Sequence, residues 1–544
     1  MSVVTTTILS SGTKIDPAYE VVSLDVTKEV NRIPCAQIVL IDGDAAKQKF
    51  VISDTKVFEP GAEIEIKLRY EGEPGKEATV FKGVVICHRV EAGQQGSLLT
   101  VELKDKAIKL AHARKSAVYR EKTDSDVIGG IIEAGGLKKG TVAATKTTHK
   151  ELVQYYCTDW DFVLSRAEAN GLLVVVNDGE MSLPEMAITG SPKHTFEYGI
   201  SEIYNFEMEA DAGHQYGSIQ SIAWDMKEQK LTSAAKAKEF TLSQGNLKAK
   251  AIAQAVGADT ALLTSPIPLV ETELQAWSDA TMARSRMAMI KGRVAVQGMT
   301  NMMLMDVIEI KGVGQRFNGK TVVTGFRHRV DQHGWQTDVQ FGLSADRFVE
   351  QPDIVDVPAA GLVPAVNGLQ IGVVVGNMED PDGEFRVKIK LPGLDESQDV
   401  WARLASPDAG KERGYFSRPE PGDEVVVGFF NDDPRHGVIL GAMYGSKNTL
   451  PKDVKVTEDN FLKAIVTKKG TMIQFDDEKA LVFIQTPAKN KILLDDDAKA
   501  VKLSDQHGNT ITMDDKGITV KSAKDFKVDA SGNVEIKGTK VDVK

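Results

Sequence analysis

The sequence predicts a mainly β protein with an α/β insertion, and three observations lead to this fold class. Short runs of alternating apolar and polar residues recur over most of the chain, which is typical of strands with one buried face. Helix-like patterns are confined to residues 111–200 and to about 271–290. Beyond residue 470 a motif returns at a fixed spacing, which indicates a stacked or wound β architecture.

The amino-terminal 355 residues divide into a β region, a mixed region and a second β region. Residues 1–110 carry alternating runs broken by Gly and Asp turns, which favours a barrel or sandwich. Residues 111–200 contain two helix patterns, "TDSDVIGGIIEAG", which starts at an Asp or Ser cap, and "TDWDFVLSRAEANG", and strand patterns follow in "GLLVVVNDGEMSL". Strands resume over 201–355 around one long helix, so the mixed region is an insertion.

A Pro- and Val-rich connection at residues 351–368 marks a domain boundary, and a compact β segment follows at 366–446. In "GEFRVKIKLPG" apolar residues alternate with Arg386, Lys388 and Lys390. This alternation predicts one wall of a small barrel. Its predicted inward residues are Phe385, Val387, Ile389 and Leu391.

The region 460–544 repeats with a period of 19 residues. Asp pairs begin at positions 476, 495 and 514, and each lies between two short strand patterns, while a looser fourth copy follows in "FKVDASGNVEIKG". Only one face of each first strand is apolar. The residues predicted on this inward face are Ile473, Phe475, Ile492, Leu494, Ile511 and Met513.

These strands have few large side chains with which to build a core. After Pro451 the chain has no Trp, Tyr or Cys, and an isolated hairpin of this kind is marginally stable in water. The apolar faces therefore need partners, and identical strands from sister chains are the simplest source. We expect a closed, intertwined symmetric oligomer.

Composition and charge limit the possible functions. The 544 residues carry a formal net charge of −11, which gives no footprint for nucleic-acid binding. Three widely spaced cysteines indicate reduced thiols in the cytoplasm. No signal peptide or long apolar run is visible, so we expect neither export by a leader nor a membrane span.

Catalytic and cofactor motifs are not evident. G-x-S-x-G and P-loop patterns are missing, and "GVGQRFNG" reads as a hairpin turn. His328 and His333 lack a third ligand and fit a hairpin turn near a surface. The Asp clusters of the repeats fit turn-forming roles better than a calcium site, because no EF-hand pattern is present. We expect no enzymatic activity, no metal and no cofactor.

Several long motifs, taken in order, resemble one family. They include "YYCTDWDFVLSRAEANGLLVVVNDGEMSL", "RFNGKTVVTGFRHRVDQHGWQTDVQFGL", "GVVVGNMEDPDGEFRVKIKLPGLDESQDVWARLASPDAG" and "RPEPGDEVVVGFFNDDPRHGVILGAMYGSKNTLP". Together these segments are similar to the VgrG proteins and to related phage tail hub and spike proteins. The resemblance covers nearly the whole chain.

The resemblance implies an architecture and a function. Residues 1–110 would form the first hub barrel, 201–355 would complete it and add a second, 366–446 would form an OB-fold barrel, and 460–544 would form a triple-stranded β-prism. The protein would be the hub and membrane-piercing spike of a contractile injection machine, either a type VI secretion system or an extracellular particle. It would be assembled in the bacterial cytoplasm and then expelled or released.

The same resemblance implies partners. A hexameric tube protein would stack on the amino-terminal barrels, baseplate proteins would surround the hub, and a cargo effector could attach. A small PAAR-like tip protein would cap the prism, and the residues expected at that contact are Val541, Val543 and Lys544. The target membrane would be pierced transiently. The alternative interpretation is a trimeric tail fibre that binds a receptor or polysaccharide, which would leave the hub motifs unexplained.

Overall fold

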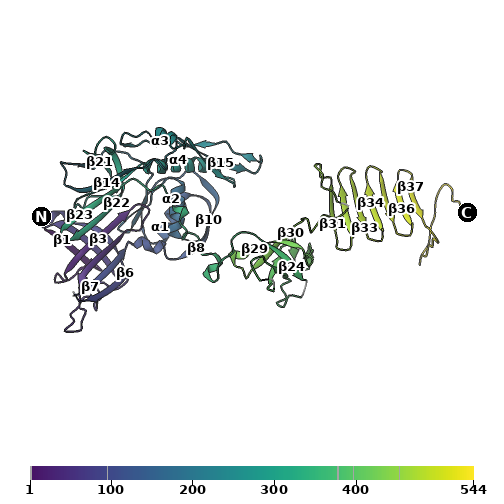
Figure 1. Ribbon diagram of the computed structural model, residues 1–544, viewed down its shortest axis with the longest axis horizontal. Coiled ribbons are helices and arrows are strands. Elements are labelled where there is room, and N and C mark those ends of the chain that lie inside the picture. Colours follow the sequence, from purple (N-terminus) through teal and green to yellow (C-terminus); the bar gives the residue numbers. More distant parts are fainter. Residues whose placement is uncertain (1–2, 95, 377–378, 396, 453, 544) are drawn as a thin grey trace. The chain divides into compact units, whose positions relative to one another are not determined.

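The computed structural model describes residues 3–94, 96–376, 379–395, 397–452 and 454–543. The chain divides into two compact units, one ending at Asp356 and one beginning at Val357 (Figure 1). Each unit is described by itself below. Among the described residues, no helix combines the length and the apolar character that crossing a membrane requires.

The amino-terminal unit is built on a 14-stranded sheet. Its main path runs β14-β20-β23-β22-β3-β4-β7-β6-β5-β1-β2, and the pairing of β22 with β3 joins late strands to early ones. The 14 strands are β1 (Val4–Ser10), β2 (Thr13–Lys14), β3 (Val21–Glu29), β4 (Cys35–Ile41), β5 (Glu63–Tyr70), β6 (Ala78–Gly93), β7 (Gly96–Lys104), β13 (His194–Glu197), β14 (Ile203–Ala210), β18 (Ser243–Gln244), β20 (Ile290–Gln297), β21 (Val307–Lys311), β22 (Gly319–Asp331) and β23 (Gly334–Phe341).

Two separate hydrophobic cores lie on this sheet. The first gathers the alternate apolar residues of β1 to β7 around Phe58 and Phe81, and the second gathers those of β20 to β23 around Phe326 and Phe341. The alternating runs predicted for residues 1–110 therefore form strands, and the hairpin predicted at "GVGQRFNG" joins β21 to β22. Strand β1, which the alternation did not single out, pairs with β5.

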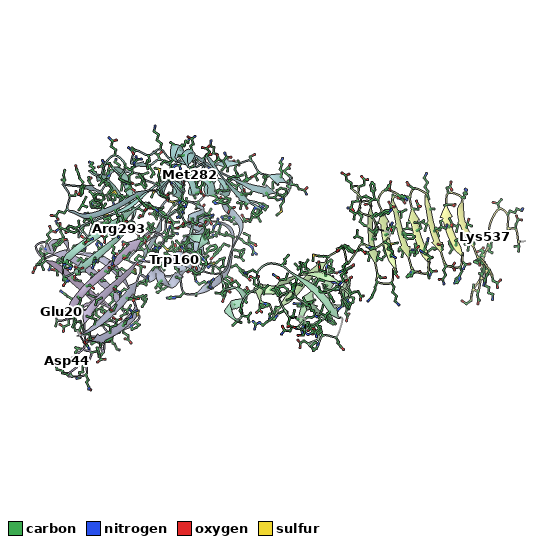
Figure 2. All side chains as sticks on the ribbon, in the orientation of Figure 1. Glu20, Asp44, Trp160, Met282, Arg293 and Lys537 are labelled. Atoms are coloured by element: carbon green, nitrogen blue, oxygen red, sulfur yellow. The ribbon has the colours of Figure 1, made fainter. Side chains whose placement is uncertain are left out.

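The mixed region predicted at 111–200 is an α/β module. It consists of β8 (Arg114–Thr123), α1 (Asp124–Ala134), β9 (Lys138–Val142), β10 (Thr148–Thr158), α2 (Asp159–Ala169), β11 (Val175–Asn177) and β12 (Glu180–Leu183). Both helices lie within the predicted segments, but the cap of α1 is Thr123 rather than the expected Asp or Ser. The hydroxyls of Thr123 and Thr158 accept hydrogen bonds from backbone amides in the first turn of each helix. Trp160 of α2 is buried in the module's own core (Figure 2).

A small four-stranded sheet and two further helices complete the unit. The elements are β15 (Ser218–Asp225), β16 (Lys230–Leu231), β17 (Ala235–Lys236), α3 (Ala249–Ala255), β19 (Thr260–Ser265) and α4 (Glu271–Met287). The long helix predicted near 271–290 is α4, which packs on β15 and β17. Helix α3 is one that the sequence pattern did not reveal, because its seven residues bury only Ala253.

The second unit begins with a closed five-stranded barrel in the order β24-β25-β26-β30-β29. The barrel strands and the adjoining hairpin are β24 (Gln370–Gly376), β25 (Val387–Lys390), β26 (Val400–Leu404), β27 (Ala409–Gly410), β28 (Arg413–Gly414), β29 (Glu424–Phe429) and β30 (Gly437–Ala442). Val387 and Ile389 are fully buried, as predicted, and Leu391 packs partly against them. The prediction for Phe385 was wrong: its side chain is 78% exposed, because its left-handed backbone (φ 57°) ends the alternation before β25.

The repeats form a seven-stranded antiparallel sheet in which every strand pairs only with its neighbours in sequence. The strands are β31 (Leu462–Val466), β32 (Met472–Asp476), β33 (Leu481–Gln485), β34 (Lys491–Asp495), β35 (Ala500–Ser504), β36 (Thr510–Asp514) and β37 (Gly517–Lys521). The two strands predicted for each repeat are confirmed. The expected fourth copy is not, because residues 522–543 form no strand in the described chain.

Short 3-10 helices in the described parts of the chain lie at Pro74–Lys76, Lys106–Leu110, Phe348–Glu350, Pro358–Gly361 and Phe430–Asp432.

Candidate functional site

The register of the seven-stranded sheet places the apolar residues of the repeats on one face. Paired residues in an antiparallel ladder share a face, and so do residues two apart on one strand. We call this surface the apolar face. Its two rows are Ile465, Ile473, Ile484, Ile492, Leu503, Ile511 and Val520, and next to them Phe475, Val482, Leu494, Val501, Met513 and Ile518.

All six residues predicted to point inward lie on the apolar face. No described residue covers most of this face, however: the exposed fractions are 40% for Ile492 and 45% for Leu494. Phe475, Ile511 and Met513 are also exposed, and only Ile473 is half-buried. A continuous apolar surface of this kind marks an interaction site in a soluble protein.

The opposite face changes character along the sheet. Its central row runs from Gln474, Phe483 and Leu493 to Lys502, Thr512 and Thr519. The carboxy-terminal strands are thus apolar on one side and polar on the other, which fixes the side on which a partner must lie.

The Asp clusters close the turns on the side of the sheet where β32, β34 and β36 end. Carboxylates of Asp476, Asp495 and Asp514 each accept a hydrogen bond from a backbone amide two or three residues later. The turn-forming role predicted for these residues is confirmed. Within the described residues, no group of three or more His, Cys, Asp or Glu side chains is placed to hold a metal ion.

Two asparagines in the turns on the other side of the sheet form hydrogen bonds to the next turn on that side. The side-chain oxygen of Asn490 accepts a hydrogen bond from the backbone amide of Gln506 at 3.1 Å. Asn509 accepts one in the same way from the amide of Ala523 at 2.8 Å. We call these two hydrogen bonds the asparagine ladder. The sequence analysis did not identify them, although the two asparagines stand one repeat period apart.

The residues expected to contact a tip protein lie in the segment after β37. Val541 and Val543 are exposed, with Val543 at 93%, and Lys544 lies outside the described residues. The looser fourth copy predicted in "FKVDASGNVEIKG" lies in the same segment, and residues 522–543 form no strand. Among the described residues of one chain, this segment has no neighbouring strand to satisfy its backbone groups. Lys537, which Figure 2 labels, forms an ion pair with the nearby Glu535.

The two histidines considered as metal ligands have different surroundings. His333 is exposed in the β22–β23 turn, as predicted. His328 is buried rather than near the surface, and its Nδ1 lies 3.0 Å from the hydroxyl of Thr337. Burial, together with the nearby charge of Lys28, lowers the pKa of His328 to about 3. The ring is therefore neutral and belongs to the core.

A buried charged cluster joins α1, α2 and β10. Arg166 donates two hydrogen bonds to Asp124, at 2.6 and 3.1 Å, and Asn170 and His149 also contact this carboxylate. Burial raises the pKa of Asp124, but the charge and hydrogen bonds of Arg166 and its neighbours outweigh burial and hold the pKa below its usual value. Each side chain of this cluster is hydrogen-bonded to another member, so the cluster holds α1, α2 and β10 together and has a structural role.

Three family descriptions match successive parts of the chain. "Alg8 N-terminal domain" matches residues 1–332, which is more than half of the chain. "Type VI secretion system/phage-baseplate injector OB domain" matches residues 370–444, and "Phage baseplate V C-terminal trimerisation domain" matches 481–544.

Several curated relatives are named as spike proteins. The chain is 28% identical over 175 residues to "Type VI secretion system spike protein VgrG1a" of Pseudomonas aeruginosa, a match that covers 29% of this chain and 27% of the relative. It is 35% identical over 96 residues to spike protein VgrG3 of Vibrio cholerae, covering 16% of this chain and 9% of the relative. The chain thus matches about a quarter of the relative's length in the first case and less than a tenth in the second.

Solved structures with similar folds include a tail protein from Neisseria meningitidis MC58, with a TM-score of 0.47 and 12% identity over 64% of this chain and 99% of that one. Another is the E. coli c3393 protein, described as a component of the type VI secretion system, with a TM-score of 0.38 and 12% identity over 80% of this chain and 99% of that one. The family matches carry the assignment: with an Alg8 N-terminal domain followed by two baseplate domains, the chain belongs to the Alg8 family and to the VgrG and phage tail hub-spike proteins.

Proposed function

We propose that this protein is the structural hub and puncturing spike of a contractile injection system and that it works as a homotrimer. The observation that carries the proposal is the uncovered apolar face of the seven-stranded sheet. The apolar face carries thirteen apolar side chains, of which ten are exposed and three are half-buried, and such a sheet needs a partner before it is stable.

Two sister copies are the simplest partner for this face. Burial of each aliphatic side chain stabilises the assembly by roughly 1.5 to 3 kcal/mol, and three identical faces closing on one axis bury all of them at once. Intertwined closure also removes the exposed sheet edges that would otherwise recruit further chains. The match of residues 481–544 to a trimerisation domain supports the same number of copies.

The two ends of such a trimer would bind different partners. The sheet of the amino-terminal unit would dock a hexameric tube protein, with baseplate proteins around it. The exposed Val541 and Val543 would contact a conical tip protein. That protein would offer backbone hydrogen-bond partners to the residues after β37, which form no strand in the described chain. Cargo could travel on this trimer or inside the tube, and the target membrane would be crossed only transiently.

The proposed action is mechanical. Contraction of a sheath elsewhere would drive the trimer forward, so the chain itself needs no catalytic residue and no cofactor. The protein would be made in the cytoplasm and leave the cell with the particle. The curated relatives are named as spike proteins of a secretion system, which supports this route.

A pair of double variants on one strand tests the trimer. Ile511→Asp with Met513→Asp places six charges on the three apolar faces, whereas Thr510→Asp with Thr512→Asp places the same charges on the opposite face of β36. Burying an unpaired charge costs several kcal/mol, so the first variant should lose the trimer and the second should keep it. Native mass measurement distinguishes them. A stable folded monomer of the unaltered protein would overturn the proposal.

A further inference from the structure

A cavity of about 800 Å³ lies at the end of the 14-stranded sheet that is near the amino terminus (Figure 1). Its walls come from the end of β5, the residues that lead into β14, the end of β20 and the β22–β23 hairpin. Because β14 begins the path of the sheet and β5 lies near its other end, distant parts of the sheet border one space. The volume falls within the roughly 300 to 1,000 Å³ of small-ligand sites.

Two hydrogen-bond donors at this cavity have no acceptor among the described residues. Trp335 is only 5% exposed, yet its indole N–H forms no hydrogen bond. The hydroxyl of Tyr70, whose ring centre lies 5.1 Å from that of the indole, forms none either. Gln297 and the amide of Gly298 lie near this hydroxyl, but the amide is donated to the carbonyl of Trp335 at 3.0 Å. Since buried polar groups are almost always paired, two adjacent unpaired donors indicate an acceptor from outside the chain.

The chemistry of these donors limits the class of ligand. An indole N–H can only donate. Burial, together with the nearby Tyr204 and Glu202, raises the pKa of the Tyr70 hydroxyl to about 12, so this group keeps its proton and can donate as well. A ligand that meets both groups must therefore offer oxygen acceptors, which an ammonium ion does not have.

The charges around the cavity disfavour an anion. Its Asp, Glu and Arg side chains are Glu202, Asp331 and Arg329, so negative charges outnumber positive ones. Arg329 is also engaged already, because its Nε lies 3.1 Å from a carboxylate oxygen of Asp331. A phosphate or carboxylate would find no free cation in this group. The remaining class is a neutral ligand rich in oxygen.

Tyr204 adds an aromatic surface to the cavity. Ile203 pairs with Val296 and Asn205 with Ala295, so Tyr204 is the extra residue of a β-bulge. Bulges turn a side chain away from the direction that a regular strand would give it. Tyr204 lines the cavity and is 56% exposed. An aromatic ring of this kind packs against an apolar surface while its hydroxyl remains free to form hydrogen bonds.

We propose that this cavity binds a neutral saccharide of one or two rings, with the C–H face of one ring against Tyr204 and its oxygens accepting hydrogen bonds from Trp335 and Tyr70. Sugars combine these features because their ring carbons form an apolar face and their hydroxyls both accept and donate. The carboxylates of Glu202 and Asp331 and the amides of Gln297 and Gln336, which also line the cavity, would receive the sugar's own hydroxyl protons.

Saturation-transfer NMR on the full-length protein gives the first test. The probes are cellobiose, maltose and N,N′-diacetylchitobiose, each at millimolar concentration. Transfer to at least one of them is expected. Absence of transfer to all three would overturn the inference and leave the two donors to buried water.

A pair of tyrosine variants shows whether the saccharide lies in this cavity. Tyr204→Ala should weaken binding of the responding disaccharide by about tenfold, because it removes the aromatic surface. The matched control is Tyr198→Ala, since Tyr198 is also 56% exposed and does not line the cavity. Titration calorimetry measures both. Equal affinities of the two variants would overturn the placement.

Two further variants test the donors without emptying the space that their rings fill. Tyr70→Phe and Trp335→Phe each remove one donor, and each should weaken binding by about fivefold. Thermal unfolding of Tyr70→Phe should be unchanged or slightly raised, since an unpaired buried hydroxyl is removed. Unchanged affinity in both variants would overturn the role of these donors.

The source of the saccharide is tested with a longer chain of the same sugar. For a cellobiose response, tighter binding of cellohexaose would identify a polysaccharide, and equal binding would identify a free sugar; both results support the cavity.

The inference does not depend on the proposed trimer. A trimer that binds none of the probes would overturn the saccharide site and leave the proposed function intact. A monomer that binds them would overturn the proposed function and leave the site.

Discussion

His328 couples the stability of the amino-terminal unit to pH. The folded protein holds its ring neutral, with a pKa of about 3, whereas an unfolded chain binds a proton near 6.5. Below pH 6.5 the unfolded state therefore takes up a proton that the folded state refuses. The stability contributed by this residue is complete above pH 6.5 and is lost progressively as the pH falls towards 3.

We predict that the amino-terminal unit loses stability by up to about 1.4 kcal/mol per pH unit below 6.5 on account of this residue. His328→Asn should flatten the pH dependence, while His333→Asn, at an exposed position, should leave it unchanged. Urea unfolding at several pH values, followed by tryptophan fluorescence, measures it, since Trp335 lies 5.9 Å from the His328 ring. An unaltered slope in His328→Asn would contradict the assignment.

Phe385 offers a second test at this scale. A core phenylalanine costs about 3 to 5 kcal/mol when it is truncated, whereas an exposed residue with a left-handed backbone is strained by its side chain. We predict that Phe385→Asn leaves the barrel as stable as before or slightly more so. Thermal unfolding compared with Val387→Ala, at the buried neighbour, provides the contrast. A loss equal to that of Val387→Ala would place Phe385 in a core.

At the scale of elements, the turns of the repeat sheet explain why the asparagine ladder formed by Asn490 and Asn509 does not extend to the preceding repeat. Asn490 and Asn509 each bind the amide at the second position of the following turn, namely Gln506 and Ala523. One period earlier the equivalent residue is Thr471, and the amide it would need belongs to Pro487. Proline has no N–H, so an asparagine at 471 would gain no hydrogen bond.

This relation predicts a coupled pair of substitutions. Thr471→Asn alone should not stabilise the repeat sheet, but in a Pro487→Gln background it should add about 1 kcal/mol through the restored hydrogen bond. A double-mutant cycle on the denaturation of the trimer measures the coupling. Equal effects of Thr471→Asn in the two backgrounds would refute the ladder.

The elements also show how far the sequence leads. Periodicity identified the repeats, the two capped helices and the inward faces, because each depends on local alternation. It missed α3 and the left-handed Phe385, whose state depends on tertiary contacts and backbone geometry. It also missed the exposed apolar residues Ile371 and Val373 of β24, since the alternation alone does not show which side of this strand faces the barrel core.

At the scale of the whole molecule, the two units differ in how their apolar side chains are buried. The amino-terminal unit has hydrophobic cores within one chain, although some of its large apolar side chains, such as Tyr155, Ile200 and Tyr204, are exposed, whereas the second unit leaves most of the apolar face of its repeat sheet uncovered. We therefore expect the apolar face to hold the copies together.

We predict that cleavage in the connection at residues 357–368 yields two folded fragments of different assembly state. The amino-terminal fragment should be released as a monomer, and the carboxy-terminal fragment should keep the threefold mass. Limited proteolysis followed by native mass measurement tests this. A monomeric carboxy-terminal fragment would mean that the apolar face does not hold the copies together.

The neighbour-only pairing of the seven-stranded sheet makes the repeats a molecular ruler. Each 19-residue period adds two strands, and strands lie about 4.8 Å apart, so every added repeat lengthens the sheet by roughly 9.5 Å without changing its cross-section. The length and the width of the spike are thus set independently. The number of periods determines how far the spike extends, and the side chains of a single period determine its width.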